Sequence, residues 1–152
     1  MLFVVKQITS GIERNLAMKA AAIVEAFCEG FKQKCQEFCM RRSLSGDEEM
    51  SPGDCEELET MLRAGVSAGG VKAMREYVES CETSVPAVKV DGELMRFKAY
   101  ESKEFHVGFG LVSIRRRLYQ PEGGGSCVSP LDMKFNVMDE FAFPSVRRGV
   151  LH

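Results

Sequence analysis

The sequence has no tryptophan, only two histidines and no long hydrophobic run. A membrane-spanning helix needs about 20 consecutive apolar residues, and no stretch of the chain approaches this length. The apolar start is interrupted at Lys6, whereas a secretion signal needs an apolar stretch of about 7–15 residues. We therefore expect a cytoplasmic protein whose six cysteines are reduced thiols and not a disulfide framework.

The cysteines and histidines lack the spacing of a metal site. Cys28, Cys35 and Cys39 lie seven and four residues apart, and the sequence contains no C-x2-C pair. Zinc needs four ligands in a tetrahedron and usually takes them from such tight pairs. The two histidines, His106 and His152, are both far in sequence from these three cysteines. We predict no metal site and no cofactor, and we interpret the cysteines as small hydrophobic residues of a helix.

Familiar catalytic motifs are also missing. The glycines of residues 123–126 lack the Gly-Lys-Ser/Thr continuation that a phosphate-binding loop requires. A Cys127–His106 pair has no orienting motif around it, and the acidic residues near the carboxyl end form no convincing set for two divalent ions. The sequence therefore predicts a protein that is not an enzyme.

The chain does not have the strong positive charge of a general nucleic-acid binder, because its net charge is −2. Residues 1–84 carry ten basic and fourteen acidic side chains, whereas residues 85–152 carry ten and eight. Residues 96–117 hold six basic side chains against two acidic ones. This local excess permits an anion-binding surface in the second half of the chain.

The first half has the apolar spacing of a long helix. Residues 12–44 contain no proline, and apolar residues such as Ile23, Phe27 and Phe31 recur at steps of three and four. The polar residues 43–53 predict a loop after this helix.

A second helix is predicted to start near residue 52. Asp54 would be its cap, with acidic residues in the first turns, where the helix dipole favours negative charge. Gly65 and the pair Gly69-Gly70 predict a break or a tight bend, followed by a short third helix over residues 71–80.

After residue 81 the hydrophobic period changes from about 3.6 to about 2, which indicates strands. We predict strands over residues 85–90, 93–100, 103–107 and 111–120. The Asp91-Gly92 pair forms the first turn, and Gly108 and Gly110 bracket a second turn. The chain is therefore predicted to be α+β, with a helical arm of two or three helices over residues 1–84. A small antiparallel sheet with an irregular tail follows over residues 85–152, and we expect the two to pack as one unit.

The most distinctive strand carries Arg115, Arg116 and Arg117. Because side chains alternate along a strand, Arg115 and Arg117 share a face with Tyr119, while Arg116 points to the other face. Arginine and aromatic side chains on one face suit contact with phosphates and bases. The alternative is an ordinary exposed sheet face, with Arg116 in a local ion pair.

The second half of the chain resembles the amino-terminal region of bacterial insertion-sequence transposases of the ISKra type. The resemblance covers roughly residues 54–150 and is clearest over residues 88–132. It rests on the order of four motifs: the Val88–Gly92 turn, the Gly110–Tyr119 strand, the glycine loop at 123–126 and the Pro130-Leu131-Asp132 element.

The resemblance implies a protein of transposition that acts on the DNA ends of a mobile element. In the resembled family, an integrase-like domain downstream of this region holds the Asp/Asp/Glu residues that bind metal. The chain ends about where that domain would begin, so no catalytic residue is carried over. We expect a non-catalytic amino-terminal part of a transposase, truncated before the catalytic domain. The strand pattern, and not the family, supplies the candidate DNA-contacting residues Arg96, Lys98, Arg115, Arg117 and Tyr119.

Two other interpretations stay open. The apolar stripe of the helix over residues 12–44 must be buried against something, and a homodimer through this helix competes with packing on the protein's own sheet. The chain could then be a structural or oligomerisation module that binds no DNA. The other alternative is a decayed remnant of a mobile element with no selected function.

Overall fold

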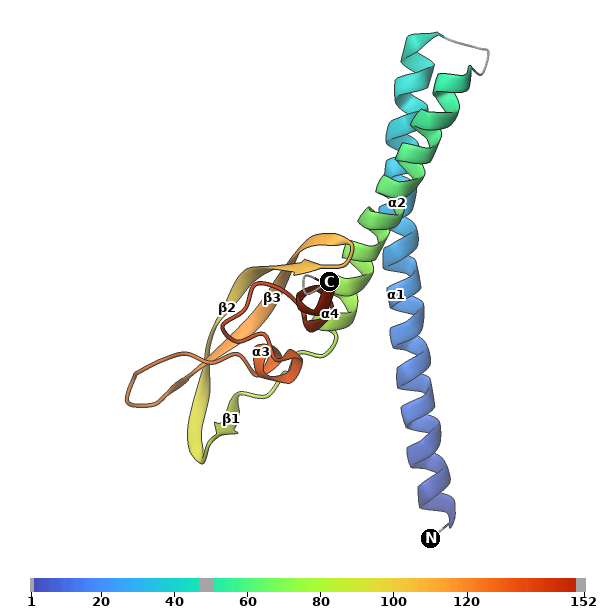
Figure 1. Cartoon of the computed structure of the whole chain (residues 1–152). Helices are drawn as coiled ribbons and strands as arrows, with labels where there is room; N and C mark the ends of the chain where they lie inside the picture. The colour runs from blue at the N-terminus through green and yellow to red at the C-terminus, as the bar shows by residue number, and fades with distance from the viewer. Residues whose placement is uncertain (1, 47–50, 150–152) are drawn as a thin grey trace. The chain divides into compact units, whose positions relative to one another are not determined.

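The computed structural model describes residues 2–46 and 51–149, with side chains for residues 17–43, 46 and 51–148. Within these residues the chain is α+β, as predicted: two long helices precede a three-stranded antiparallel sheet and two short helices (Figure 1). None of the described helices is long and apolar enough to cross a membrane. The chain divides into two compact units, residues 1–77 and 78–152, so the boundary lies slightly before the predicted one.

The first unit is built from two helices that run antiparallel and side by side (Figure 1). Helix α1 spans Leu2–Ser45 and is longer than the predicted helix over residues 12–44. Helix α2 spans Pro52–Glu79, and its last residues, Val78 and Glu79, belong to the second unit. The loop predicted at 43–53 includes residues 47–50, which lie outside the described residues.

The start of α2 is a reciprocal capping arrangement, in which Ser51 precedes the helix and Pro52 is its first residue. The Asp54 amide donates to the Ser51 hydroxyl at 3.4 Å, and the Ser51 amide donates to the Asp54 carboxylate. The prediction that Asp54 caps the helix was therefore wrong: the cap is Ser51, three residues earlier, and Asp54 is its partner in the first turn. The hydrogen bond from the Ser51 backbone, followed by that from Arg42, holds the pKa of Asp54 below its usual range.

The glycines of α2 do not break the helix, which corrects the prediction of a third helix over residues 71–80. Gly65 and Gly69 lie where α2 contacts α1. A Cβ atom at Gly69 would lie 2.7 Å from the Phe27 carbonyl oxygen, and one at Gly65 would lie 2.8 Å from the Phe31 ring. On the opposite helix, a Cβ atom at Gly30 would lie 2.7 Å from the Ala68 carbonyl oxygen. Each glycine is therefore needed for close packing and not for chain flexibility.

The second unit is built on one antiparallel sheet in the order β1-β2-β3, with β1 at Ala87–Val90, β2 at Glu93–Val107 and β3 at Gly110–Pro121. The Asp91-Gly92 turn is confirmed, and both of its residues have positive φ angles, 49° and 87°. The segments predicted as separate strands at 93–100 and 103–107 are one strand. Its pairing with β3 shifts by one residue between Phe97 and Ala99.

One face of this sheet is covered by the tail of the chain, which contains the short helices α3 (Pro130–Phe135) and α4 (Pro144–Gly149). The buried residues on this side include Phe105, Val107, Val112 and Ile114 from the sheet, and Leu131, Val137 and Phe143 from the tail. The Phe105 and Phe143 rings meet edge to face at 5.5 Å. A parallel bridge between His106 and Ala142 ties the tail to the outer edge of β2.

The glycine contacts generate a stability prediction. Gly69→Ala should lower the free energy of unfolding by about 1–2 kcal/mol, because overpacking against the Phe27 carbonyl outweighs the better helix propensity of alanine. Denaturant titration followed by far-UV circular dichroism measures the change.

The matched control is Gly53→Ala, which lies in the same helix. Its new Cβ atom would meet only the Ser51 hydroxyl, at 3.7 Å. This variant should be neutral or gain up to about 1 kcal/mol. Equal stabilisation by both substitutions would contradict the close approach of α1 and α2.

Candidate nucleic-acid interface

Strand β3 directs its three consecutive arginines to two different environments. Arg116 lies on the covered face, where its side chain is only 11% exposed, whereas Arg115 is exposed and Arg117 is half-buried. This is the alternation that the sequence pattern predicts. The two environments differ in chemistry, because carboxylates surround Arg116 and aromatic rings surround Arg115 and Arg117.

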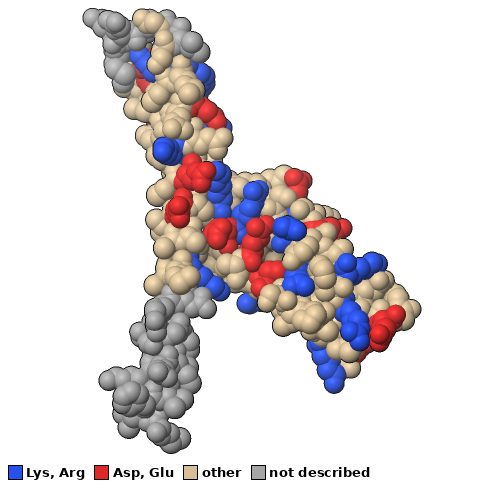
Figure 2. All heavy atoms as spheres, turned by 180° about the vertical axis from the view of Figure 1, so that it is seen from behind, with Lys and Arg blue, Asp and Glu red and all other residues tan. Residues whose placement is uncertain are grey.

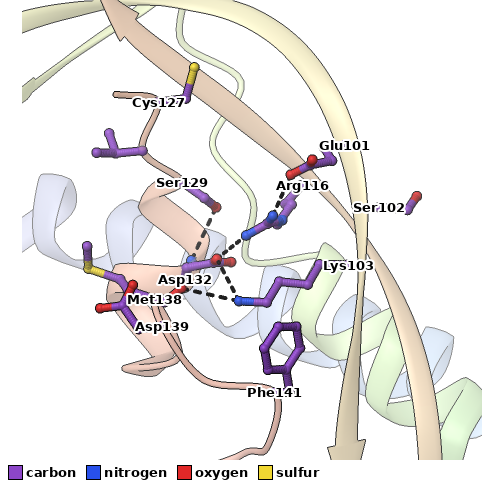
Figure 3. A pocket seen from close by; sticks show the side chains of 11 residues that line it. Glu101, Ser102, Lys103, Arg116, Cys127, Ser129, Asp132, Met138, Asp139 and Phe141 are labelled. Atoms are coloured by element: carbon purple, nitrogen blue, oxygen red, sulfur yellow. Dashed lines mark hydrogen bonds and ion pairs between the residues drawn. The ribbon is translucent and has the colours of Figure 1, made fainter. Parts of the chain in front are cut away.

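On the covered face, Arg116 is held by an acidic residue on each side. Its guanidinium forms an ion pair with Asp132, whose side chain is 5% exposed, and a second with Glu101 at 2.5 Å (Figure 3). Such an ion pair is favourable only where the buried charges are well matched. The alternative interpretation of Arg116, a local ion pair, is therefore confirmed, and Arg116 is not available to a ligand on the other face.

The start of α3 positions Asp132 for this contact. Ser129 caps the helix and accepts a hydrogen bond from the Asp132 amide at 3.3 Å, while Pro130 occupies the first turn. Leu131 is buried in the core. Burial raises the pKa of Asp132, and the charges of Arg116 and Lys103 partly offset this effect. The Pro-Leu-Asp element that contributes to the family resemblance therefore has a clear structural role in this chain.

Lys103 completes the cluster on the covered face. Its ammonium group donates to the carbonyls of Val137 and Met138, at 3.3 and 3.2 Å, and lies 3.9 Å from the Asp132 carboxylate. It also lies 5.0 Å from the centre of the Phe141 ring, as Figure 3 shows below the cluster.

A cavity of about 450 Å³ opens at this cluster, lined among others by Ser102, Cys127 and Asp139. Its two cationic side chains, Lys103 and Arg116, are matched by Asp132 and Glu101. Together with Asp139 the lining has three acidic and two basic side chains, so it has no positive excess with which to attract an anion. The cluster serves to attach the tail to the sheet.

The opposite face carries a different arrangement, which we call the arginine–aromatic stack: Phe97, Tyr100, Arg115, Arg117 and Tyr119. The Arg117 guanidinium lies 4.2 Å from the Phe97 ring centre and 5.7 Å from those of Tyr100 and Tyr119. The Arg115 guanidinium lies 4.0 Å from the Tyr100 ring centre. From Phe97 to Arg115, rings and guanidinium groups thus alternate along the face, which is the arrangement that cation–π attraction favours.

Two carboxylates close to these arginines bind the backbone instead of the side chains. The amides of Arg115 and Arg117 donate to Glu79 and Glu82, at 2.7 and 2.8 Å, along the outer edge of β3. Among the described residues, no carboxylate forms an ion pair with the Arg115 guanidinium. The Tyr100 ring therefore holds the Arg115 guanidinium in place, and no carboxylate among the described residues neutralises its charge.

The structure brings only part of the predicted site together. Arg115 and Arg117 share the stack, but Arg96 is adjacent to Phe97 on an extended strand, so its side chain points to the other face, where it pairs with Glu122 at 3.4 Å. Lys98 is exposed and lies at the register shift of β2.

Tyr119 requires a correction, because it is fully buried and donates its hydroxyl hydrogen to the Val85 carbonyl at 2.7 Å. Its desolvation raises the pKa of the phenol. Tyr119 packs against Phe97 at the buried end of the stack and has no exposed surface for DNA.

Sequence reasoning missed two members of the stack, Phe97 and Tyr100. Tyr100 pairs with Arg117 across the β2–β3 ladder, and 51% of its surface is exposed. Treating residues 93–107 as one strand would have revealed this pairing, because the two-residue turn after Val107 places Tyr100 opposite Arg117.

Other candidate sites of the sequence do not assemble in the described part of the chain. No group of three or more His, Cys, Asp or Glu residues there could hold a metal ion. All six cysteines are free of disulfides. Of the three that the sequence places in the apolar stripe of the first helix, Cys28 and Cys39 are exposed and Cys35 is half-buried. On the face seen in Figure 2, basic and acidic side chains intermingle, and no broad basic surface is present on the described part of that face.

No protein-family model, curated protein or solved structure matches the chain.

The Arg116–Asp132 pair generates a thermodynamic prediction. Asp132→Ala should cost on the order of 3–5 kcal/mol of unfolding free energy, because it leaves the Arg116 guanidinium buried without its main counter-charge. The double variant Arg116→Met/Asp132→Leu should lose clearly less than Asp132→Ala alone, because it removes both charges together. Urea denaturation of the unaltered protein and the two variants checks this, and a double variant that loses as much stability as Asp132→Ala, or more, would contradict it.

Proposed function

We propose that this chain is a non-catalytic, cytoplasmic part of a transposase that contacts DNA at the ends of a mobile element. The order of the four motifs that resemble ISKra-type transposases supports this assignment. The observation that carries the DNA contact is Arg115, an exposed guanidinium fixed on the Tyr100 ring at 4.0 Å without a carboxylate partner among the described residues.

The position of this arginine suits a phosphate ligand. A guanidinium that already lies on a ring loses little conformational freedom when it binds, so its hydrogen bonds to a phosphate cost less entropy. Lys98 is a second exposed cation on the same strand as Tyr100. Arg96 stays in the proposal as a weaker candidate, because binding would compete with its ion pair to Glu122.

The acidic balance of the whole chain limits the strength of this contact. Long-range attraction by net charge is absent, so we expect binding to depend on a few local contacts and to weaken steeply with salt. This behaviour would distinguish the protein from a uniformly basic DNA-binding domain.

A second role, self-association through α1, is favoured by apolar residues exposed beside the α1–α2 contact. Val24 on α1 is 61% exposed and Val66 on α2 is 45% exposed, and Cys28 and Cys39 are also exposed. We propose that a second copy of the chain covers this strip, because the row of exposed apolar residues on α1 recurs at the spacing of a helix–helix seam.

The DNA proposal predicts a measurable loss on removal of the two exposed cations. Arg115→Ala/Lys98→Ala should weaken binding to a labelled duplex in fluorescence anisotropy. It should also reduce the slope of log affinity against log salt by about 1–2, because each phosphate contact contributes about 0.9. The matched control is Lys89→Ala, which removes an exposed cation from β1. Absence of binding by the unaltered protein at low salt would refute the DNA role.

The self-association proposal predicts a dimer in solution. Val24→Glu/Val66→Glu should convert the dimer to a monomer of unchanged helix content. A dimer of this variant would have to bury the new glutamate charges of both subunits in the contact. Light scattering after size exclusion measures the mass, and the control Arg63→Glu alters the exposed side chain of an ion pair with Glu59 on α2. A monomeric unaltered protein at high concentration would remove this role.

A further inference from the structure

The arginine–aromatic stack ends on an open side. From the buried end it proceeds through Tyr119, Phe97, Arg117 and Tyr100, and its last member is Arg115. Phe97 contacts Tyr119 and Tyr100 edge to face, at 6.1 and 5.2 Å, which fixes the orientation of each ring. The order of the stack is therefore set from inside the fold, and only its last two members are exposed.

A guanidinium group is flat and has two faces that can stack. The central carbon of the Arg115 guanidinium lies over the Tyr100 ring, 4.0 Å from its centre, and among the described residues no second ring lies over this group. The side chain of Arg115 is exposed, and half of the Tyr100 surface is exposed beside it. The stack therefore presents a planar, positively charged surface that can accept one more flat group.

Nucleobases are flat groups that stack on aromatic rings and on arginine planes. In a duplex, each base is already stacked between its neighbours, so a single exposed plane on a sheet surface cannot reach it. An unpaired base can leave its neighbours at low cost and take the open position next to Arg115. The same guanidinium would still hold the adjacent phosphate through its edge.

We propose that Arg115 and Tyr100 form a stacking site for an unpaired nucleobase, so that the preferred ligand is single-stranded or locally opened nucleic acid. This inference rests on the proposed DNA contact and specifies its substrate class. It fits the charge of the chain, because stacking contributes affinity without the net positive charge that this protein lacks.

The test compares a labelled single strand of mixed sequence, about 15 nucleotides long and therefore within the range of known single-strand sites, with a hairpin duplex of the same sequence. The unaltered protein should bind the single strand more tightly in fluorescence anisotropy at the same salt. Tyr100→Leu, which keeps the apolar bulk but removes the ring, should weaken single-strand binding about 5- to 150-fold. Tyr100→Phe should keep most of the affinity, because it keeps the ring.

Arg115→Lys separates stacking from charge. Lysine keeps the positive charge and a phosphate contact but has no plane on which a base could stack. Arg115→Lys should therefore weaken single-strand binding while leaving duplex binding and the salt slope nearly unchanged. The control Leu111→Ala changes an exposed residue on the same strand, outside the stack, and should leave both affinities unaltered.

Tyrosine emission gives a second readout. The chain has three tyrosines and no tryptophan, and Tyr119 is fully buried. A base stacked at Arg115 and Tyr100 should quench part of the emission, and Tyr100→Phe should abolish that part of the quenching while binding persists.

The outcomes separate the two proposals. Equal affinity for single strand and duplex, with Arg115→Lys and Tyr100→Leu as strong as the unaltered protein, would refute the stacking site and leave the DNA contact standing. No binding to either nucleic acid at low salt would refute both, and a protein partner would then be the ligand to seek for this face. Single-strand preference lost in both variants would support the stacking site.

Discussion

The buried ion pair between Arg116 and Asp132 determines how the second unit is organised. Asp132 lies on α3, so the pair joins the tail of the chain to the covered face of the sheet. Because neighbours on a strand point to opposite faces, fixing Arg116 inward also fixes Arg115 and Arg117 outward. The attachment of the tail and the exposure of the arginines are thus consequences of one contact.

The two faces of the sheet stabilise positive charge by different means. On the covered face, Asp132 and Glu101 neutralise the charge of Arg116, and the burial of its side chain limits its contact with water. On the other face, aromatic rings hold the guanidinium groups of Arg115 and Arg117 in place without cancelling their charge. A chain with a net negative charge can in this way keep a cation available for an anionic or aromatic ligand.

The sequence alone was sufficient for the fold class, the Asp91-Gly92 turn and the alternation of β3, because local periodicity and turn chemistry determine these features. It was not sufficient for the glycines of α2. Glycine at Gly65 and Gly69 is equally consistent with a helix break and with close helix contact, and only the presence of Phe27 and Phe31 on the facing helix decides between them. The prediction of Tyr119 as a DNA-contacting residue was wrong for a similar reason. Alternation predicts the face on which a side chain lies, but not whether other residues cover it, and Tyr119 is fully buried.

The register shift between Phe97 and Ala99 has a consequence for how this surface can change in evolution. Phe97 and Tyr100 are three residues apart, so in a regular strand their side chains would point to opposite faces. The extra residue of the bulge restores the matching parity, and both rings face Arg117. Point substitutions can therefore alter the members of the stack one at a time, whereas the loss of a single residue near Lys98 would invert every later side chain of β2 or force its pairing to slip. The surface should tolerate changes of residue type far better than changes of strand length.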